Sequence, residues 1–279
     1  MFNCYAQLLT TTSINFTHRE KNKTKLLDSV MRRGLFKQIN YLIAKAIHTY
    51  DMIKEGDKIL VAVSGGKDSL TLLWFLKERL KWIPINYELL ALHIDLGFKD
   101  ESNDKLISFF EENEIRYKIV KTDIGPKAHS EINKKNPCFF CSRQRRKLIF
   151  EIADELGYSK IAYGHHKDDV IETLFLNIFY GANISTMLPV QEFFDNRFKI
   201  IRPLYLVDEI LIEKFFKSKG WTEKESGCPT SFSSKRKDIK DLLQGIYKTD
   251  KRIKENIFHA IHNLRPEYLP SSLLLHKGI

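Results

Sequence analysis

Apolar residues along the chain form two kinds of run that alternate. Short runs rich in branched side chains predict buried strands at 58–63, 88–95, 117–121, 160–165 and 199–204. Apolar residues at helical spacing between them predict helices near 103–113, 142–156 and 169–180, and a further helix runs from about residue 35 toward the first strand. This alternation predicts an α/β fold with a doubly wound, mostly parallel sheet, which places ligands at the carboxyl ends of its strands.

The two ends of the chain differ from its middle. Residues 1–30 are rich in Thr, Asn and Lys without a clear hydrophobic period, and we interpret them as a flexible or dispensable extension that ends before Met31. A targeting peptide is the alternative, since no acidic residue occurs before Glu20. Residues 31–207 form the predicted α/β domain. Residues 208–279 are helical and basic, which predicts an appended helical segment.

Charge narrows the range of partners. The net charge is +10 and the isoelectric point is about 9.2, so a polyanion is a plausible partner. Basic residues cluster at 143–147 and 233–240. The apolar runs are shorter than the roughly 18–20 residues of a membrane span, which predicts a cytoplasmic protein without a membrane partner. Four cysteines are too few for a disulfide framework in 279 residues.

The string "VSGGKDS" follows the first predicted strand and begins an amphipathic helix. A glycine-rich turn there directs unpaired N–H groups and the positive end of the helix dipole at one point, which is an anion site. Lys67 adds a positive charge, and Ser64 and Ser69 add hydroxyl donors. The alternative is an ordinary turn in which Asp68 or Ser69 caps the helix. The string "SGGKDS" resembles the pyrophosphate-binding loop of the PP-loop ATP pyrophosphatases, which split ATP into AMP and pyrophosphate.

Cys138 and Cys141 stand at the predicted start of a helix, after Pro137. The helix dipole there should lower the pKa of both thiols and favour the thiolate that binds metal or attacks. Arg145 follows Cys141 by one helical turn and lies on the same face. Cys228 is a third candidate far along the chain. A redox dithiol, a zinc site completed by a histidine such as His129, and a [4Fe–4S] cluster on three thiolates all stay open.

The string "YGHHKDDVIETLFLNIFYG" places His165, His166, Asp168 and Asp169 at the carboxyl end of a predicted strand. One aspartate should cap the following helix, and Asp169 with Glu172 has the form of a capping box. A carboxylate at that place can also hold Mg²⁺ on ATP phosphates or orient an attacking oxygen.

Together these strings resemble the tRNA 2-thiocytidine synthetase family. The resemblance covers about residues 31–270 and rests on "SGGKDS", "ALHID", "PCFFCSRQRR", "GHHKDDVIETLFLNIFYG", "RPL" and "NIFHAIHNLRPEYLP". "SGGKDS" marks only the superfamily, whereas "CFFCSRQRR" with "GHHKDDVIETLFLN" is more specific. Around Cys228 the familiar members carry a second nearby cysteine, and this chain has none in "GCPTSFSSK".

The resemblance implies roles for particular residues. Catalytic residues would be Asp169, Arg145 and Lys67, with Arg145 standing where a related thiouridine branch has a catalytic lysine. A [4Fe–4S] cluster would be held by Cys138, Cys141 and Cys228. The nucleotide would be bound by Ala62, Val63, Ser64, Gly65, Gly66, Lys67, Asp68, Ser69, His93, Ile94, Gly164 and Asp169.

The implied activity is ATP-dependent thiolation of tRNA in the cytoplasm. C2–O of an anticodon-loop cytidine would be adenylated and its oxygen replaced by sulfur, with ATP, Mg²⁺ and the cluster as cofactors. A sulfur donor system, either a cysteine desulfurase or sulfide, would supply the sulfur, and a homodimer is an open arrangement. The basic residues Lys235, Arg236, Lys237 and Lys240 would bind tRNA phosphates.

Three alternative functions account for different features of the sequence. A 2-thiouridine-forming enzyme of the same superfamily shares the chemistry but modifies another nucleotide. A lysidine-type tRNA ligase uses the loop but gives the three cysteines no role. A zinc-containing nucleic-acid-binding module uses the charge and the thiols but gives "SGGKDS" no role.

Overall fold

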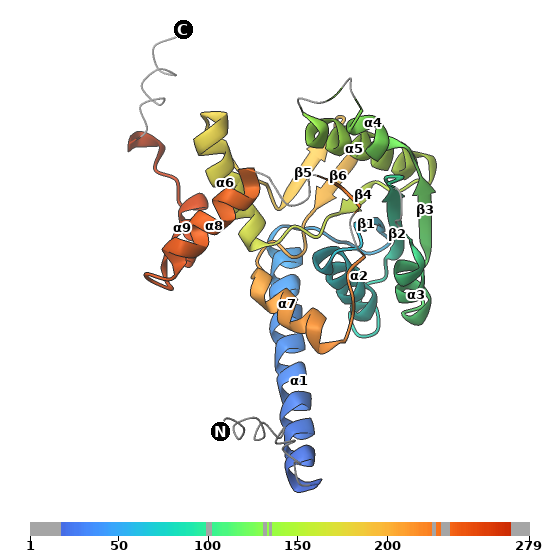
Figure 1. The fold of residues 1–279 in the computed structure, drawn as a ribbon, viewed down its shortest axis with the longest axis vertical. Helices are drawn as coiled ribbons and strands as arrows, with labels where there is room; N and C mark the ends of the chain where they lie inside the picture. Colours follow the sequence, from blue (N-terminus) through green and yellow to red (C-terminus); the bar gives the residue numbers. More distant parts are fainter. Residues whose placement is uncertain are drawn as a thin grey trace, which may run out of the picture.

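The computed structural model of the chain describes residues 18–98, 102–130, 133, 136–224, 227–229 and 235–268, with side chains from residue 32 onward. Six strands form one sheet in the order β3-β2-β1-β4-β6-β5 (Figure 1). Their bounds are β1 (Lys58–Ala62), β2 (Glu88–Asp95), β3 (Tyr117–Lys121), β4 (Lys160–Ala162), β5 (Val190–Phe193) and β6 (Phe198–Ile201). All neighbours pair in parallel except β5, which runs antiparallel to β6. The predicted mostly parallel α/β sheet is therefore confirmed.

Alternating side chains of the buried strands supply two cores, one on each face of the sheet. On β1, Ile59 and Val61 pack into one core and Leu60 packs into the other, as a period of two requires. Helices α1 (His18–Thr49), α2 (Lys67–Arg79), α3 (Asp104–Glu112) and α7 (Glu209–Ser218) cover the first face. Helix α5 (Pro137–Glu155) and the short α4 (Ile124–Ala128) cover the second.

A third, smaller core lies beside the sheet and is made mainly by helices. Helix α6 (Lys167–Gly181) packs there against α8 (Lys235–Tyr247) and α9 (Ile253–Ile261), around the fully buried ring of Tyr205. These three helices stand together on one side of the sheet (Figure 1). A short 3₁₀ helix, Pro266–Tyr268, follows α9. Helices α8 and α9 of the predicted C-terminal segment are thus attached through α6, whereas α7, which the prediction placed in the same segment, covers the first face of the sheet.

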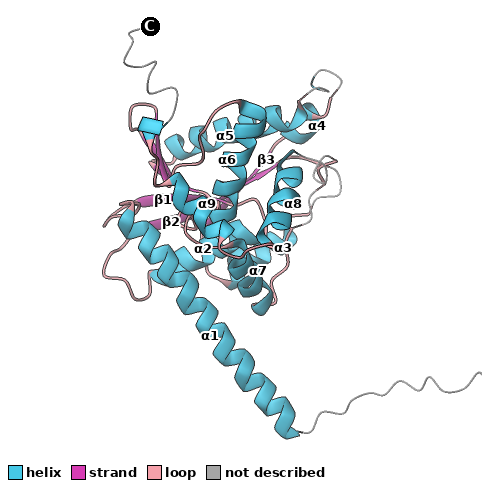
Figure 2. Cartoon of the chain, turned by 90° about the vertical axis from the view of Figure 1, so that its left-hand side faces the viewer, coloured by secondary structure: helices cyan, strands magenta, loops and turns pink. Residues whose placement is uncertain are grey.

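The elements differ from the sequence prediction mainly at their ends. Helix α1 begins at His18 instead of near residue 35, and it projects beyond the body of the molecule (Figure 2); residues 1–17 lie outside the described part. Strand β4 ends at Ala162, three residues before the predicted end. The antiparallel edge strand β5 was not predicted, because its four residues show only partial burial and weak alternation. Within the described residues, no helix is long and apolar enough to cross a membrane.

Candidate active site

Serine hydroxyls close the loop between β1 and α2. Ser69 Oγ accepts a hydrogen bond from Ser64 N at 3.2 Å and donates one to Gly66 O at 3.0 Å, while Ser64 Oγ accepts one from Gly66 N at 3.3 Å. Gly65 has a φ of +91°, in the left-handed region that glycine adopts without strain. The N-cap residue of α2 is Gly66, which has no side chain. The alternative in which Asp68 or Ser69 caps this helix is therefore wrong.

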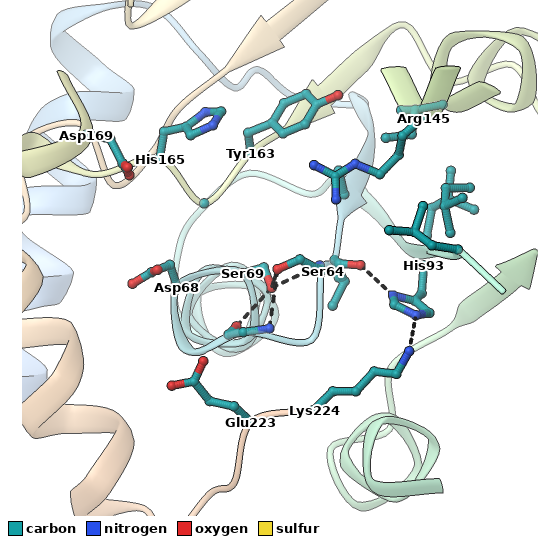
Figure 3. A pocket seen from close by; sticks show the side chains of 18 residues that line it. Ser64, Asp68, Ser69, His93, Arg145, Tyr163, His165, Asp169, Glu223 and Lys224 are labelled. Carbon is teal, nitrogen blue, oxygen red and sulfur yellow. Dashed lines mark hydrogen bonds between the residues drawn. The ribbon is translucent and has the colours of Figure 1, made fainter. Parts of the chain in front are cut away.

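A segment from far along the chain, residues 221–224, lies across this loop, and we call it the crossing segment (Figure 3). Glu223 Oε2 accepts a hydrogen bond of 3.1 Å from Lys67 N, the first amide of α2. Lys224 N donates to Gly65 O at 3.0 Å, and a Cβ built on Gly65 would lie 2.7 Å from Lys224 Cβ. A carboxylate oxygen thus lies at the predicted anion site. The sequence analysis missed both Glu223 and Lys224, since no local pattern connects them to the loop.

A cavity of about 440 Å³ opens at the carboxyl ends of β1, β2 and β4 (Figure 3). The predicted nucleotide-binding residues that line it are Ala62, Val63, Ser64, Gly66, Asp68, Ser69, His93, Ile94, Gly164 and Asp169. Arg145, Tyr163, His165, Glu223 and Lys224 line it as well. Gly65 forms the turn of the loop, and Lys67 lines a second cavity next to this one. Residues from four separate segments, which the sequence analysis assigned to one site, therefore do lie together in the structure.

His93 and Gly164 determine how closely the loop lies against the neighbouring strands. His93 Nδ1 lies 2.8 Å from Val63 O; because a carbonyl oxygen only accepts, this nitrogen carries the proton. His93 Nε2 then accepts from Lys224 Nζ at 3.4 Å. A Cβ built on Gly164 would lie 2.9 Å from the backbone of Asp68 and Ser69. Glycine at position 164 therefore allows the end of β4 to approach the first turn of α2.

Asp169 lies at the first turn of α6, where it forms a capping box with His166. His166 N donates to Asp169 Oδ2 at 3.0 Å, and His166 Nδ1 accepts from Asp169 N at 3.4 Å. The predicted box of Asp169 with Glu172 is therefore wrong, because the cap lies three residues earlier. Burial raises the pKa of Asp169, but the nearby His166, His165 and Arg236 outweigh it and hold the pKa below its usual range. Burial also lowers the pKa of His165 to about 4, which keeps this ring neutral.

The carboxylates of Asp68 and Asp169 both lie next to the His166 ring. His166 Nε2 lies 3.7 Å from Asp68 Oδ1 and 3.4 Å from Asp169 Oδ2. Within the described part of the chain, Asp68 Oδ1 is buried and has no hydrogen-bond partner, and burial raises the pKa of this carboxyl. Mg²⁺ prefers one or two carboxylates together with substrate phosphates. Asp168 and Asp169 both accept hydrogen bonds: Asp168 Oδ2 accepts from Glu209 N at 2.8 Å, and Asp169 accepts from His166 N and Arg236 Nη1.

The second cavity, of about 340 Å³, lies between the loop and α8. Lys240 Nζ binds both oxygens of Glu209 at 2.8 and 2.6 Å, and Lys67 Nζ binds Glu209 Oε1 at 3.0 Å. Burial raises the pKa of Glu209, but these two cations outweigh it and lower the pKa to about 2. Arg236 Nη1 donates to Asp169 Oδ1 at 2.9 Å.

The basic residues of α8, which the sequence analysis assigned to tRNA phosphates, fall into two groups in the structure. Arg236 and Lys240 face inward and contact acidic side chains of the site. Lys237 Nζ binds Asp241 at 2.7 Å, and Lys235 Nζ lies 4.4 Å from the centroid of the Tyr180 ring. Arg236 and Lys240 belong to the candidate active site, whereas Lys235 and Lys237 are exposed.

Helix α5 connects the cavity to the cysteines. Pro137 is its first residue, as predicted, so Cys138 and Cys141 lie in the first two turns. Arg145, one turn after Cys141, directs its guanidinium into the cavity (Figure 3). Cys228 Sγ lies 3.7 Å from His129 Nε2. Cys4, the fourth cysteine, lies outside the described residues.

The Cys141 thiol does not have the acidity that the helix dipole suggested. Burial raises the pKa of the Cys141 thiol; the charge of Arg145 opposes this, and the charges of Cys228 and Cys138 add to it. The predicted lowering of its pKa is therefore wrong, because Cys141 packs against the second core. Among the described residues, no group of three or more His, Cys, Asp or Glu side chains is arranged to hold a metal ion. The three thiols nevertheless lie close enough to interact electrostatically, and their chemistry suits iron.

Comparisons with known proteins agree with this site. The family model of the PP-loop domain matches residues 35–245. The chain is 34% identical over 252 residues to tRNA-cytidine(32) 2-sulfurtransferase of Syntrophotalea carbinolica, covering 89% of this chain and 97% of that protein. It is 35% identical over 266 residues to the protein of the same name from Klebsiella pneumoniae, covering 94% of this chain and 83% of that protein.

A solved structure matches the fold. It is the U34-tRNA thiolase NcsA from Methanococcus maripaludis with its [4Fe-4S] cluster, at a TM-score of 0.69 and 27% sequence identity, covering 83% of this chain and 79% of that one. The resemblance predicted from the sequence is thus confirmed at the level of the family. The chain belongs to the PP-loop family, and within it to the family of the tRNA-cytidine(32) 2-sulfurtransferases.

Proposed function

We propose that this chain is an ATP-dependent tRNA sulfurtransferase that converts cytidine 32 of the anticodon loop to 2-thiocytidine in the cytoplasm. The observation that carries the proposal is the path of α5. This helix holds Cys138 and Cys141 at its start and directs Arg145 into the cavity formed by the loop and the acids. A site that only hydrolyses ATP would not need thiols one helical turn from the nucleotide.

The first step requires activation of a poor leaving group. C2–O of the cytosine attacks the α-phosphorus of ATP, the bond to the β-phosphate oxygen breaks, and pyrophosphate leaves. The amides of the Gly65–Gly66 turn and Lys67 stabilise the charge that develops on pyrophosphate. Asp68 and Asp169 would hold Mg²⁺, which neutralises phosphate charge when bound.

The second step replaces the activated oxygen. Sulfur attacks C2, and AMP leaves with the former C2 oxygen. Arg145 stays charged, so it stabilises the negative charge that develops on the departing phosphate but does not act as a base. Cys138, Cys141 and Cys228 would hold a [4Fe–4S] cluster, which supplies an iron without a protein ligand for binding sulfur.

The thiol ligands can be tested one at a time. Cys138→Ser, Cys141→Ser or Cys228→Ser should each bleach the visible absorption of anaerobically reconstituted protein and stop formation of 2-thiocytidine. ATP binding should survive, because the loop is a separate anion site. Cys4→Ser is the matched control and should change none of these. Mass spectrometry of nucleosides from unmodified tRNA, with ATP and sulfide, gives the readout.

Two outcomes would contradict the proposal in different ways. Full activity of colourless, chelator-treated protein with sulfide would exclude the cluster as the sulfur carrier and leave direct attack of sulfide on the adenylated C2. A 2-thiouridine product at position 34 would instead favour the activity for which the structurally similar archaeal thiolase is named.

A further inference from the structure

An exposed apolar face lies at the far end of α6, the helix that begins at the acidic residues of the site. The residues that form it are in the last turn of α6 and the following loop, and each side chain is 40–64% exposed: Ile178, Phe179, Tyr180, Ile184 and Leu188. We call this group the α6 face. Exposed apolar groups of this size mark interaction sites more often than ordinary surface.

The α6 face is presented by an ordered surface. Asn177 Nδ2 donates to Ser185 O at 2.9 Å and to Ser185 Oγ at 3.0 Å, which ties the loop to the helix. The Thr186 hydroxyl donates to Val170 O, so the loop turns back along α6. Ala182, at φ +50°, ends the helix in the left-handed conformation that makes this reversal. The loop and the last turn of α6 therefore act as one structural unit.

The same loop leads to the cavity of the candidate active site. Arg202 Nη1 donates to Leu188 O, and Arg202 Nε lies 3.2 Å from His165 Nδ1. His165 lines the cavity, with its ring stacked on Tyr163 at 5.5 Å between centroids and 14° between planes. Along α6 itself, Tyr180 lies about 17 Å from Asp169, at 1.5 Å per residue. The loop that carries Leu188 is thus tied through Arg202 to a residue that lines the cavity, and the α6 face lies at the opposite end of α6 from Asp169.

Positive charge accompanies the aromatic side chains. Lys235 Nζ lies 4.4 Å from the centroid of the Tyr180 ring. Arg202, at the other end of the loop, is buried, so the cation beside the exposed rings is Lys235. Exposed aromatic rings beside lysine and arginine side chains are how proteins hold unpaired nucleotides: the rings stack on bases and the cations meet phosphates.

We propose that the α6 face is a stacking platform for the unpaired nucleotides next to the one that enters the cavity. Phe179 and Tyr180 stack on bases of the RNA loop, and Lys235 contacts the backbone. This inference rests on the proposed function, which requires one base to leave the anticodon loop while its neighbours are held.

The test measures binding of an anticodon stem-loop RNA to the full chain by fluorescence anisotropy. Phe179→Ala and Tyr180→Ala should each weaken binding about tenfold, and the double variant about a hundredfold, which is the range for loss of a base–aromatic stack. The salt dependence should stay unchanged, because no phosphate contact is removed. Lys235→Glu should reduce the slope of that dependence by about one.

Ile210→Ala is the matched control, since Ile210 is also about half exposed, at 50%, but lies on α7. It should leave RNA binding unchanged, and all variants should bind ATP like the wild type. Wild-type affinity in the double variant would overturn the platform. Analytical ultracentrifugation gives a second way to overturn it. If the wild type is a dimer, and the double variant is a monomer that still binds RNA, then the α6 face contacts a second copy of the chain and not RNA.

Failure of the platform can be separated from failure of the proposed function. If the wild type binds and thiolates tRNA and the double variant does so with the same KM, only the platform is wrong. If the wild type neither binds nor thiolates any tRNA, the proposed function fails and this inference fails with it.

Discussion

Glu223→Ala should make the protein bind ATP more tightly. The Glu223 carboxylate accepts a hydrogen bond of 3.1 Å from Lys67 N, at the first amide of α2. That amide is one of the groups with which a helix N-terminus binds phosphate. ATP must therefore displace the carboxylate or share the site with it, and either requirement weakens binding.

Two contributions set the size of the effect. A hydrogen bond to a charged group contributes about 1.5–3 kcal/mol, and we take about 1 kcal/mol because Glu223 is exposed. Repulsion between its charge and a phosphate about 5 Å away adds up to about 1 kcal/mol in water. Together they predict an ATP affinity about five- to thirtyfold higher in the variant.

Isothermal titration calorimetry with MgATP at fixed ionic strength measures this directly. Glu223→Gln should show an intermediate gain, since the amide oxygen still accepts but carries no charge. Glu192→Ala is the matched control: it removes the same charge from β5, where Glu192 pairs with Lys199. Equal or weaker ATP binding by Glu223→Ala would refute the reasoning and make Glu223 a residue that supports the nucleotide site.

Two further predictions concern packing and protonation. Gly164→Ala should lower the free energy of unfolding by about 1–3 kcal/mol and weaken ATP binding, since its Cβ would lie 2.9 Å from the backbone of α2. The control is Gly245→Ala in α8, where an added Cβ meets no atom within 4 Å and should not lower stability. Equal Tm values for the two variants would contradict this prediction. Burial raises the pKa of Glu172 to about 7, with the Asp169 charge adding to it. The folded state therefore keeps a proton that the unfolded chain loses above about pH 4.5, and the stability from Glu172 is lost as pH rises to about 7. Urea titrations at pH 5 and pH 8 measure this: between the two pH values the free energy of unfolding should fall by about 2 kcal/mol more in the wild type than in Glu172→Gln. The same fall in both proteins would contradict the prediction.

Local sequence was sufficient for the elements that carry the site. The strands at 88–95 and 117–121 have the predicted bounds, because each is a short apolar run between polar turns. The start of α5 at Pro137 was predictable, because the fixed backbone angle of proline suits the first turn of a helix. The resemblance to the PP-loop family added roles for residues that local pattern alone could not give.

Local reasoning was wrong at α6 and at Cys141 for different reasons. The box of Asp169 with Glu172 had the right spacing, yet the box forms three residues earlier, between His166 and Asp169, and Asp169 also accepts from Arg236 of α8. The Cys141 thiol lies at a helix start, yet packing against the second core raises its pKa. At Cys141 the tertiary environment outweighs the contribution of the local motif.

The sequence by itself determined five of the six strands, the glycine turn and the cysteine-bearing helix, because each depends on residues within a few positions of one another. Only the tertiary structure placed the crossing segment over the loop, turned Arg236 and Lys240 inward, and brought Cys228 to His129. Those contacts join segments tens of residues or more apart. They depend on how the helices pack around the sheet, and no short-range pattern in the chain records that packing.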